Sequence, residues 1–383
     1  MTSPSGPLAG IRVLDLSAYI AGPYGCALLA DMGADVVKIE PPAGDNLRKY
    51  PSTLESESRA FLGVNRSKRG VVLDLKKPDD LARLHALVRT ADVLVHNFRP
   101  EVPARLGIAC EQLRVHNPRL IYCAVSGYGD TGPLRDKAGY DQVLQTMTGM
   151  AAMQGPAGGP PGILYGSVVD YYAASLVAGG VSAALFERER SGQGQSIGVS
   201  LLRSALAMQS ARLVWADSEP RDVGGRDMRS GGITGIHPTR EGWLYISANT
   251  PHFWQALCEK TGLQDLLVER YDSVRKRAVH AQEIVPKLHA ALASRSALEW
   301  EALFGEEVPC AASREVEDMF DFPQVQSEGM VHRFEHPAVG GYRGFAGAWT
   351  FDRTPDPAPF AAPALDEHGD ALRAEADRER KGK

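Results

Sequence analysis

The stretch that decides the fold is IRVLDLSAYIAGPYGCALLADMGADVVKIE, residues 11–40. Ile11–Leu16 is apolar enough for a buried strand, and a loop containing Ala21–Pro23 follows it. Small residues over Tyr24–Met32 predict a closely packed helix, and Val36–Glu40 predicts a second strand. Strand, helix and strand in this order indicate a parallel sheet.

The same alternation continues to about residue 205. Further strands are predicted at Gly70–Leu75, Asp92–His96 and Leu120–Ser126, and Pro78 opens a helix. We therefore predict an α/β fold with a mostly parallel sheet covered on both faces. Ligands of such sheets usually lie beyond the carboxyl ends of the strands, so functional residues are expected in the loops that follow them.

The pattern changes after residue 205. A polar, Gly-rich linker is followed by elements typical of a smaller α+β domain: a strand at Gly242–Ser247 and helices at Pro251–Thr261, Tyr271–Ser294 and Ala297–Phe304. Short strands return after Val308, at His332–His336 and Gly344–Trp349. The charged tail after Asp366 is expected to extend along the surface.

The charge, apolar runs and cysteine spacing of the chain argue against several classes of protein. The formal net charge of −5 over 383 residues gives no reason to expect nucleic acid as a partner. No uninterrupted apolar run reaches the roughly 18 residues of a membrane span, and the first residues lack the pattern of a signal peptide. Five dispersed cysteines without metal-binding spacing indicate reduced thiols, a cytoplasmic location and no metal site.

Asp170 is the first candidate for chemistry. It ends Gly166–Asp170 and directly precedes the small and apolar run Tyr171–Phe186. A carboxylate in the first turn of a helix is stabilised by free backbone N–H groups and the helix dipole, so it should stay ionised and be able to attack an activated carbonyl. The alternative from local pattern alone is that Asp170 only caps the helix.

The chain resembles the class III CoA-transferases, the CaiB/BaiF family. The resemblance rests on ordered motifs along nearly the whole chain: Gly10–Leu16, Ala21–Pro23, Leu29–Pro42, Asn65–Arg69, Leu73–Lys76, Asn97–Pro100, Arg105–Gly107, Gly139–Asp141 and Ser191–Gln195. It implies an interlocked homodimer and a Rossmann-like large domain made from both ends of the chain. The expected divisions are a large CoA-binding domain in 1–205, a linker in 206–235, a small α+β domain in 236–310 and a returning segment in 311–383.

The resemblance also implies chemistry. In formyl-CoA transferases the nucleophilic aspartate lies twenty-five residues before the last Gln of a Gly-x-Gly-Gln turn, and counting back from Gln195 reaches Asp170. The implied reaction moves CoA from a donor such as succinyl-CoA to a small organic acid, through an aspartyl anhydride and an aspartyl–CoA thioester. Asp141 matches an acidic position of the family, with an auxiliary catalytic or loop-positioning role; alternatively it caps the helix running to Met150.

Coenzyme A is implied as a substrate, with no permanently bound cofactor. Its contacts are expected at Ile20, Ala21, Leu73, Asp74, Leu75, Lys76, Asn97, Phe98, Arg99, Arg105, Ala138, Gly139 and Tyr140. The three cations of this set can pair with the phosphates of CoA, and an aromatic ring can line its channel.

Departures from the family pattern keep alternatives open. Ile20 replaces the glutamine of formyl-CoA transferases, which argues against formate or oxalate as the substrate. His96 replaces a glutamate and is expected to be neutral and partly buried. An α-methylacyl-CoA racemase or isomerase is the first alternative, but Tyr140 stands where racemases carry the proton-moving histidine. A catalytically inactive acyl-CoA-binding protein is the second.

Overall fold

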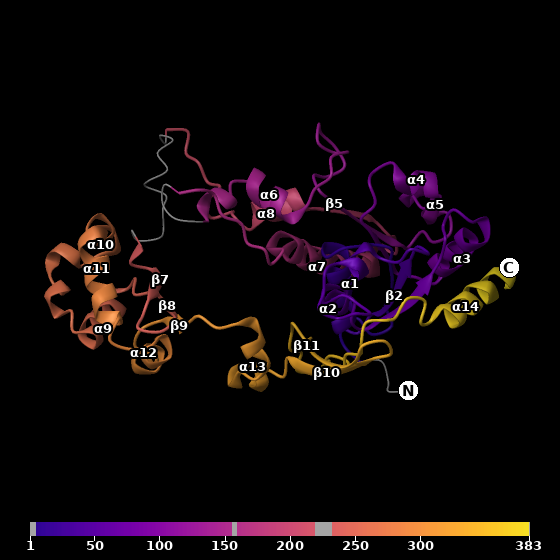
Figure 1. Cartoon of the computed structure of the whole chain (residues 1–383). Coiled ribbons are helices and arrows are strands. Elements are labelled where there is room, and N and C mark those ends of the chain that lie inside the picture. The colour runs from indigo at the N-terminus through magenta and orange to yellow at the C-terminus, as the bar shows by residue number, and fades with distance from the viewer. Residues whose placement is uncertain (1–4, 155–158, 219–231, 383) are drawn as a thin grey trace. The chain divides into compact units, whose positions relative to one another are not determined.

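We describe the chain from a computed structural model, whose described residues are 5–154, 159–218 and 232–382. It forms two compact units, one of Met1–Leu213 with Phe320–Lys383 and the other of Val214–Met319. Figure 1 labels the helices and strands of both. Most of the predicted linker, 206–235, falls within the second unit, and so does the start of the segment that was predicted to return at residue 311.

The large unit is built on one six-stranded sheet. Its strands are β1 (Arg12–Asp15), β2 (Asp35–Glu40), β3 (Lys68–Val72), β4 (Val93–His96), β5 (Ile121–Ser126) and β6 (Ser196–Ser200). They lie in the order β3-β2-β1-β4-β5-β6, and all neighbouring pairs are parallel. The order reverses between β1 and β4, where Val13 pairs with both Val36 and Val93. This doubly wound arrangement confirms the predicted α/β fold.

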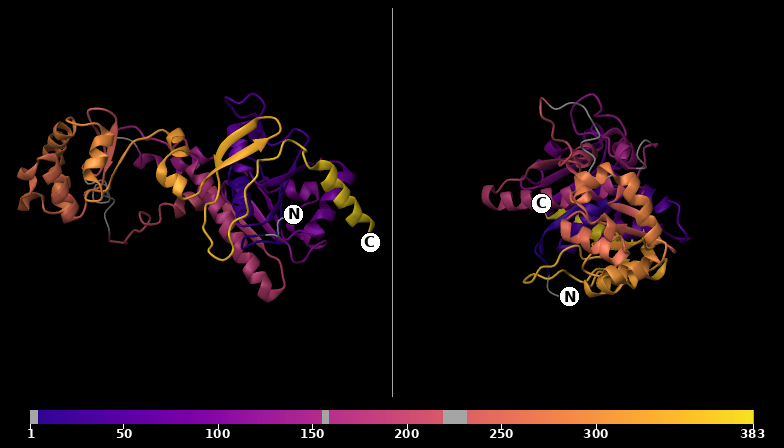
Figure 2. Two further views of the ribbon diagram at one scale, coloured as in Figure 1. Left: turned by 90° about the horizontal axis from the view of Figure 1, so that it is seen from below. Right: turned by 90° about the vertical axis from the view of Figure 1, so that its left-hand side faces the viewer.

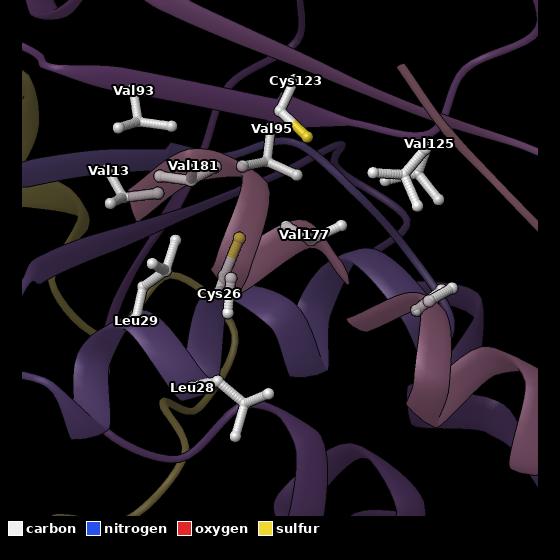
Figure 3. Close-up of a cluster of buried hydrophobic side chains, with 14 of the residues drawn as sticks. Val13, Cys26, Leu28, Leu29, Val93, Val95, Cys123, Val125, Val177 and Val181 are labelled. Atoms are coloured by element: carbon white, nitrogen blue, oxygen red, sulfur yellow. The ribbon is translucent and has the colours of Figure 1, made fainter. Parts of the chain in front are cut away.

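Helices cover both faces of this sheet. They are α1 (Ala21–Asp31), α2 (Arg59–Val64), α3 (Pro78–Arg89), α4 (Val102–Leu106), α5 (Cys110–Arg114), α6 (Asp141–Met147), α7 (Val168–Ser191) and α8 (Leu201–Ala207). Because side chains alternate along a strand, Val13 and Val95 face α1 and α7 while Leu14 and Leu94 face α3. Figure 3 shows the first of these cores, with Val177 of α7 among the strand side chains.

The long helix α7 is the central helix of that core. By length and composition alone it passes as a membrane span, which the sequence analysis did not foresee. Its buried residues Val169, Val177 and Val181 pack with the strands and α1. The sequence Glu187–Arg190 ends the apolar run, and Gly192 terminates the helix in the left-handed conformation that glycine adopts most easily. α7 therefore carries Asp170 on a rigid, well-packed element.

The second unit has its own core. An antiparallel sheet of β7 (Gly235–Pro238), β8 (Trp243–Ile246) and β9 (Cys310–Ala312) is accompanied by α9 (Pro251–Thr261), α10 (Val274–Val279), α11 (Ala281–Leu292) and α12 (Ala297–Phe304). The single helix predicted over Tyr271–Ser294 is wrong, because the chain breaks at His280 between α10 and α11. The predicted helices Pro251–Thr261 and Ala297–Phe304 are confirmed.

The C-terminal segment returns to the large unit. It contains α13 (Pro323–Ser327), the antiparallel pair β10 (Val331–His336) and β11 (Gly340–Phe345), and α14 (Gly369–Lys381). The strand predicted at Gly344–Trp349 lies four residues too late, because the hairpin turns at a left-handed Gly340. Both strands end before the Pro-rich residues that follow.

The expected extended tail is wrong. Residues 369–381 form α14, which packs against α3 and β3 and lies beside them in Figures 1 and 2. Leu372 and Ala376, spaced by four residues, are fully buried, and Arg83 pairs with Asp377 at 3.1 Å. The composition of the tail is charged, so this narrow apolar stripe was hidden within it.

Candidate active site

A cavity of about 1050 Å³ opens where the strand order of the sheet reverses. Its lining comes mainly from the loops after β1, β2, β3, β4 and β5 and from the start of α7. This is the position at which doubly wound sheets bind ligands, beyond the carboxyl ends of the strands. All lining residues belong to the large unit.

Nearly all predicted site residues meet in this cavity. The lining includes Ile20, Ala21, Leu73, Asp74, Leu75, Lys76, Asn97, Phe98, Arg99, Ala138, Gly139, Tyr140, Asp141 and Asp170. Arg105 is the exception: it lies on α4 with an exposed side chain and does not line the cavity. Its neighbours Val102 and Leu106, on the same short helix, do line it.

Asp170 lies in the first turn of α7, but its surroundings differ from the expectation. Burial, and then the nearby Asp141, raise the pKa of Asp170 to about 7. The backbone N–H groups of Val169 and Asp170 are not free, because both donate to Asp141 Oδ2, at 2.6 and 3.1 Å. The prediction that Asp170 stays ionised because of free N–H groups is therefore wrong. Asp170 titrates near neutral pH.

The Asp141 side chain accepts from the first turn of α7 and does not cap α6, whose N-cap residue is Tyr140. The Asp141 side chain is buried, and its second carboxylate oxygen accepts from the amide of Gln145. That amide also donates to Leu164 O at 2.8 Å and accepts from Leu164 N at 2.9 Å. Asp141 and Gln145 thus fix the segment that enters α7, so Asp141 is a positioning residue for Asp170. Because Asp141 and Asp170 are 29 residues apart, no local sequence pattern indicates this contact.

Gly139 has a packing role. A Cβ atom built on Gly139 would lie 2.6 Å from Gly127 Cα, so the loop that carries Tyr140 touches the loop after β5 backbone to backbone. This close approach brings Tyr140 and Asp141 next to the carboxyl end of β5.

Four cations line the cavity: Lys76, Arg99, Arg135 and Lys137. The sequence analysis identified the first two and missed the others. Arg135 and Lys137 follow the Gly-rich turn after β5, and a loop after a parallel strand was a position at which cations could have been sought.

Residues 96–98 have mixed roles. His96 is buried, and burial lowers the pKa of its imidazole to about 4, which confirms the predicted neutral histidine. Phe98 stacks on it with ring centroids 5.6 Å apart. Asn97 uses both amide atoms on Ala18: Nδ2 donates to Ala18 O at 2.7 Å, and Oδ1 accepts from Ala18 N at 2.9 Å. Asn97 therefore shapes the loop after β1.

Aromatic residues of the cavity, Tyr19, Tyr50 and Tyr165, were missed. Tyr19 and Tyr50 line it together with Tyr140, and Tyr19 contacts both other rings edge-on, at centroid distances of 6.4 and 6.3 Å. Tyr19 and Tyr50 lie outside the short motifs of the family, so no sequence signal selected them.

Charged residues buried beside the cavity were also missed. Lys68 donates to Asp15 Oδ2 at 2.8 Å, and Lys38 lies 3.0 Å from Asp45 Oδ2. Burial would raise the pKa of Asp15, but Lys38 and Lys68 lower it to about 2. The signal was present in the sequence, because Asp15 and Lys38 interrupt otherwise apolar strands that are buried on both faces.

The fold and this cavity define an α/β protein that binds its ligand at the switch point of a parallel sheet. The family model described as CoA-transferase family III matches residues 8–369. The chain is 34% identical to the succinate–glutarate CoA-transferase of Agrobacterium fabrum, over 86% of each chain. It is 34% identical to the acetyl-CoA:oxalate CoA-transferase of Acetobacter aceti, over 97% of this chain and 96% of that one.

Solved structures agree. A CaiB/BaiF family protein from Brucella suis matches with a TM-score of 0.86 at 27% identity, covering 97% of this chain and 100% of that chain. The chain therefore belongs to CoA-transferase family III and is a CoA-transferase. This confirms the family, the enzyme class and the predicted transfer activity.

Proposed function

We propose that this enzyme transfers CoA from a donor acyl-CoA, such as succinyl-CoA, to a small organic acid, with Asp170 as the nucleophile. The observation that carries the proposal is the position of Asp170, whose carboxyl group lies in the switch-point cavity on the first turn of a rigid core helix. A carboxylate there can attack a thioester presented from the loops opposite.

The proposed reaction proceeds through two kinds of covalent intermediate. The Asp170 carboxylate attacks the thioester carbonyl, so a mixed anhydride forms and CoA leaves as its thiolate. The thiolate then attacks the aspartyl carbonyl, which releases the donor acid and leaves an Asp170–CoA thioester. The acceptor carboxylate attacks this thioester, and the thiolate finally attacks the acyl carbonyl of the new anhydride. Product acyl-CoA leaves and the Asp170 carboxylate is restored.

Asp170 must lose its proton before it can attack. With a pKa of about 7, roughly half of the enzyme molecules carry the carboxylate at pH 7. A pKa in this range also makes the carboxylate more basic than an ordinary aspartate, which favours attack on a carbonyl. Asp141 positions Asp170 by accepting hydrogen bonds from the first turn of α7, and its negative charge helps to raise the pKa of Asp170.

The cavity supplies groups that suit CoA. Lys76, Arg99, Arg135 and Lys137 provide positive charge for the phosphates, and arginine can bind them in a bidentate manner. Phe98 offers an aromatic ring to the pantetheine or adenine part. We propose no permanently bound cofactor and no metal in the reaction.

Asp170→Asn tests this function. Asparagine keeps the size of the side chain but lacks the anionic nucleophile, so transfer should fall by about 10³-fold or more while free CoA still binds. Exchange between acyl-CoA donors and an acid panel is followed by liquid-chromatographic mass spectrometry, and CoA binding by titration calorimetry. Asp79→Asn is the matched control, because Asp79 also lies in the first turn of a helix but is exposed and outside the cavity.

The outcomes separate the candidates. Near-wild-type transfer by Asp170→Asn, checked for deamidation, contradicts the proposal. Exchange of the α-hydrogen of an acyl-CoA with solvent deuterium, in the absence of CoA exchange, identifies a racemase or isomerase instead. Binding of acyl-CoA without either reaction identifies an inactive binding protein.

We further propose an interlocked homodimer located in the cytoplasm. The family resemblance motivates the dimer, and exposed apolar side chains in the large unit support it. Phe186 is 68% exposed, and Leu213 is 54% exposed. Exposed apolar surface of this kind is what a partner subunit covers.

A further inference from the structure

The loop after β1 is held by side chains from three directions. Lys38, on β2, donates to Ser17 O at 2.5 Å. Asn97, directly after β4, binds both the N–H and the carbonyl of Ala18. Asp45, in the loop after β2, accepts from Tyr19 N at 3.2 Å. The backbone N–H or C=O groups of three consecutive residues, 17–19, therefore bind buried or half-buried side chains.

This brace, defined as Lys38, Asp45 and Asn97, is built around a buried charge pair. Lys38 is fully buried and lies 3.0 Å from Asp45 Oδ2, while Asp45 Oδ1 accepts the backbone N–H groups of Tyr19 and Leu47. A buried ammonium group is stable only with such partners. The Lys38–Asp45 pair therefore holds the loop after β1 in one conformation.

What the brace holds in place is a strained residue. Tyr19 has φ of 65°, a left-handed conformation that residues with a side chain rarely adopt. Such conformations persist where the surroundings over-determine them, and they cluster at functional sites. Here the strain directs the Tyr19 ring into the cavity, against Tyr50 and Tyr140. Asn46 donates to the Tyr19 hydroxyl at 3.2 Å and fixes its far end.

The three rings share the cavity with Asp170. Burial and then the neighbouring Tyr19, Tyr140 and Asp170 raise the pKa of Tyr50, so the Tyr50 phenol lies within electrostatic range of Asp170. The groups that must approach the Asp170 carboxyl group are the thioester carbonyl of the acyl donor and the carboxylate of the acceptor acid. The remainder of the acid must therefore lie against the cavity residues around Asp170.

We propose that Tyr19 is a specificity-determining residue for the acid and that the Lys38–Asp45–Asn97 brace holds it in its strained position. Tyr19, Tyr50 and Tyr140 together form a tyrosine wall, which selects acids with an apolar body over two-carbon acids. The inference rests on the proposed function and adds the class of acid to it. Edge-on aromatic rings offer apolar surface to an alkyl or aryl chain, whereas acetate has no chain to reach them.

The test compares selectivity and not activity alone. The ratio of kcat/KM for hexanoate and 3-phenylpropanoate to that for acetate is measured with succinyl-CoA as donor, or with acetyl-CoA and isotope-labelled acetate if the wild type accepts only acetyl-CoA. Wild type should favour the larger acids by at least tenfold. Tyr19→Asn should lower this ratio by tenfold, because asparagine tolerates positive φ but removes the ring. Tyr19→Phe retains the ring and should keep the ratio.

Asp45→Asn tests the role of the brace. This variant keeps an acceptor for Tyr19 N but loses the charge pair with Lys38. The ratio should fall at least threefold while the affinity for free CoA, measured by calorimetry, changes less than twofold. If that variant does not fold, Asn97→Asp replaces it, because its second carboxylate oxygen repels Ala18 O. A brace variant with the wild-type ratio overturns the role of the brace.

Other outcomes overturn the role of Tyr19. These are an unchanged ratio in Tyr19→Asn, an equal loss with every acid including acetate, or a wild type that prefers acetate. Glutarate taken in preference to hexanoate, with no effect of Tyr19→Asn, also contradicts the apolar wall. Failure of the proposed function looks different, because the wild type would then exchange CoA with no acid at all.

Discussion

Asp170 and Asp141 show how two carboxyl groups on one site take different roles. Asp141 accepts two backbone N–H groups and an amide hydrogen bond, so its environment provides donors. Asp170 is half-buried, and within residues 5–154, 159–218 and 232–382 no group donates a hydrogen bond to its side chain, so its pKa is raised to about 7. These environments agree with the proposal that Asp141 positions the site and Asp170 reacts. The sequence could place Asp170 by its distance from Gln195, but not its ionisation, which depends on a contact 29 residues away.

Asp170→Asn should stabilise the folded protein at high pH. The folded-state pKa of about 7 lies above the ordinary value of 3.8, so the folded state holds this proton more tightly than the unfolded state. Wild-type stability should fall as pH rises from about 4 to 7, and the variant should escape this loss. At pH 8 it should unfold with a free energy higher by ~2–4 kcal/mol, measured in urea. Equal stability of both proteins at pH 4 and at pH 8 would contradict the raised pKa.

Asp141→Asn should shift the pH dependence of transfer. Removing a negative charge beside Asp170 lowers the pKa of that carboxyl group, so the acidic limb of the kcat/KM profile should move to lower pH by roughly 0.5–1 unit. The amide oxygen of asparagine can still accept from the first turn of α7, which keeps the fold. Measurement of kcat/KM between pH 5 and 9 checks this. A limb that stays in place, or moves upward, would show that Asp141 does not act on Asp170 by its charge.

Elements carry information that single residues do not. Strands β1 to β5 and helices α1, α3 and α7 were predictable because their apolar patterns and turn residues are local, whereas β6 was not predicted. The Lys68–Asp15 pair was not predicted, because charges from different strands meet only once the sheet is formed, and the Lys38–Asp45 pair was not predicted, because it depends on how the loop after β2 folds back. For the same reason α14 was missed: Leu372 and Ala376 acquire a partner surface only against α3 and β3. The loop residues Tyr19 and Tyr50 were missed for the same reason, because they come together only in the folded protein.

Lys68→Met should destabilise the protein strongly. Lys68 is fully buried, and its ammonium group donates to Asp15, Asn65 and Pro23 O, all within 2.8 Å. Removing Lys68 leaves the buried Asp15 with only the more distant Lys38, at 3.8 Å, and breaking a buried pair typically costs ~3–5 kcal/mol in the free energy of unfolding. Arg69→Met is the control, because Arg69 pairs with Asp35 on the surface and should cost about 1 kcal/mol or less. Similar losses in the two variants would show that the buried pair contributes little.

The whole molecule joins distant parts of the chain. The large unit contains residues from both ends, since the C-terminal segment brings α14 onto β3 and α3. Ser67 N donates to Phe360 O at 2.9 Å, and His368 N donates to Gly70 O at 2.9 Å. A chain that leaves a domain and returns to it forms a loop, and two such loops can be threaded, which is the arrangement proposed for the dimer.

The enzyme should therefore sediment as a dimer at low micromolar concentration. Threaded subunits cannot separate by opening an interface, so dissociation should occur only together with unfolding. Mixing tagged and untagged dimers, followed by affinity capture, should yield no mixed dimers under native conditions. A monomer at these concentrations, or subunit exchange within hours without denaturant, would contradict the interlocked arrangement.

The central claim is that Asp170 becomes covalently linked during transfer. The most direct measurement is to incubate the enzyme with acyl-CoA, treat it with hydroxylamine or borohydride, digest it and map the peptides by mass. We expect the hydroxamate or the reduced alcohol on the peptide that contains Asp170, and no such product in Asp170→Asn. An enzyme that transfers CoA at its full rate while this peptide stays unmodified, or that carries the label on another residue, would contradict the account.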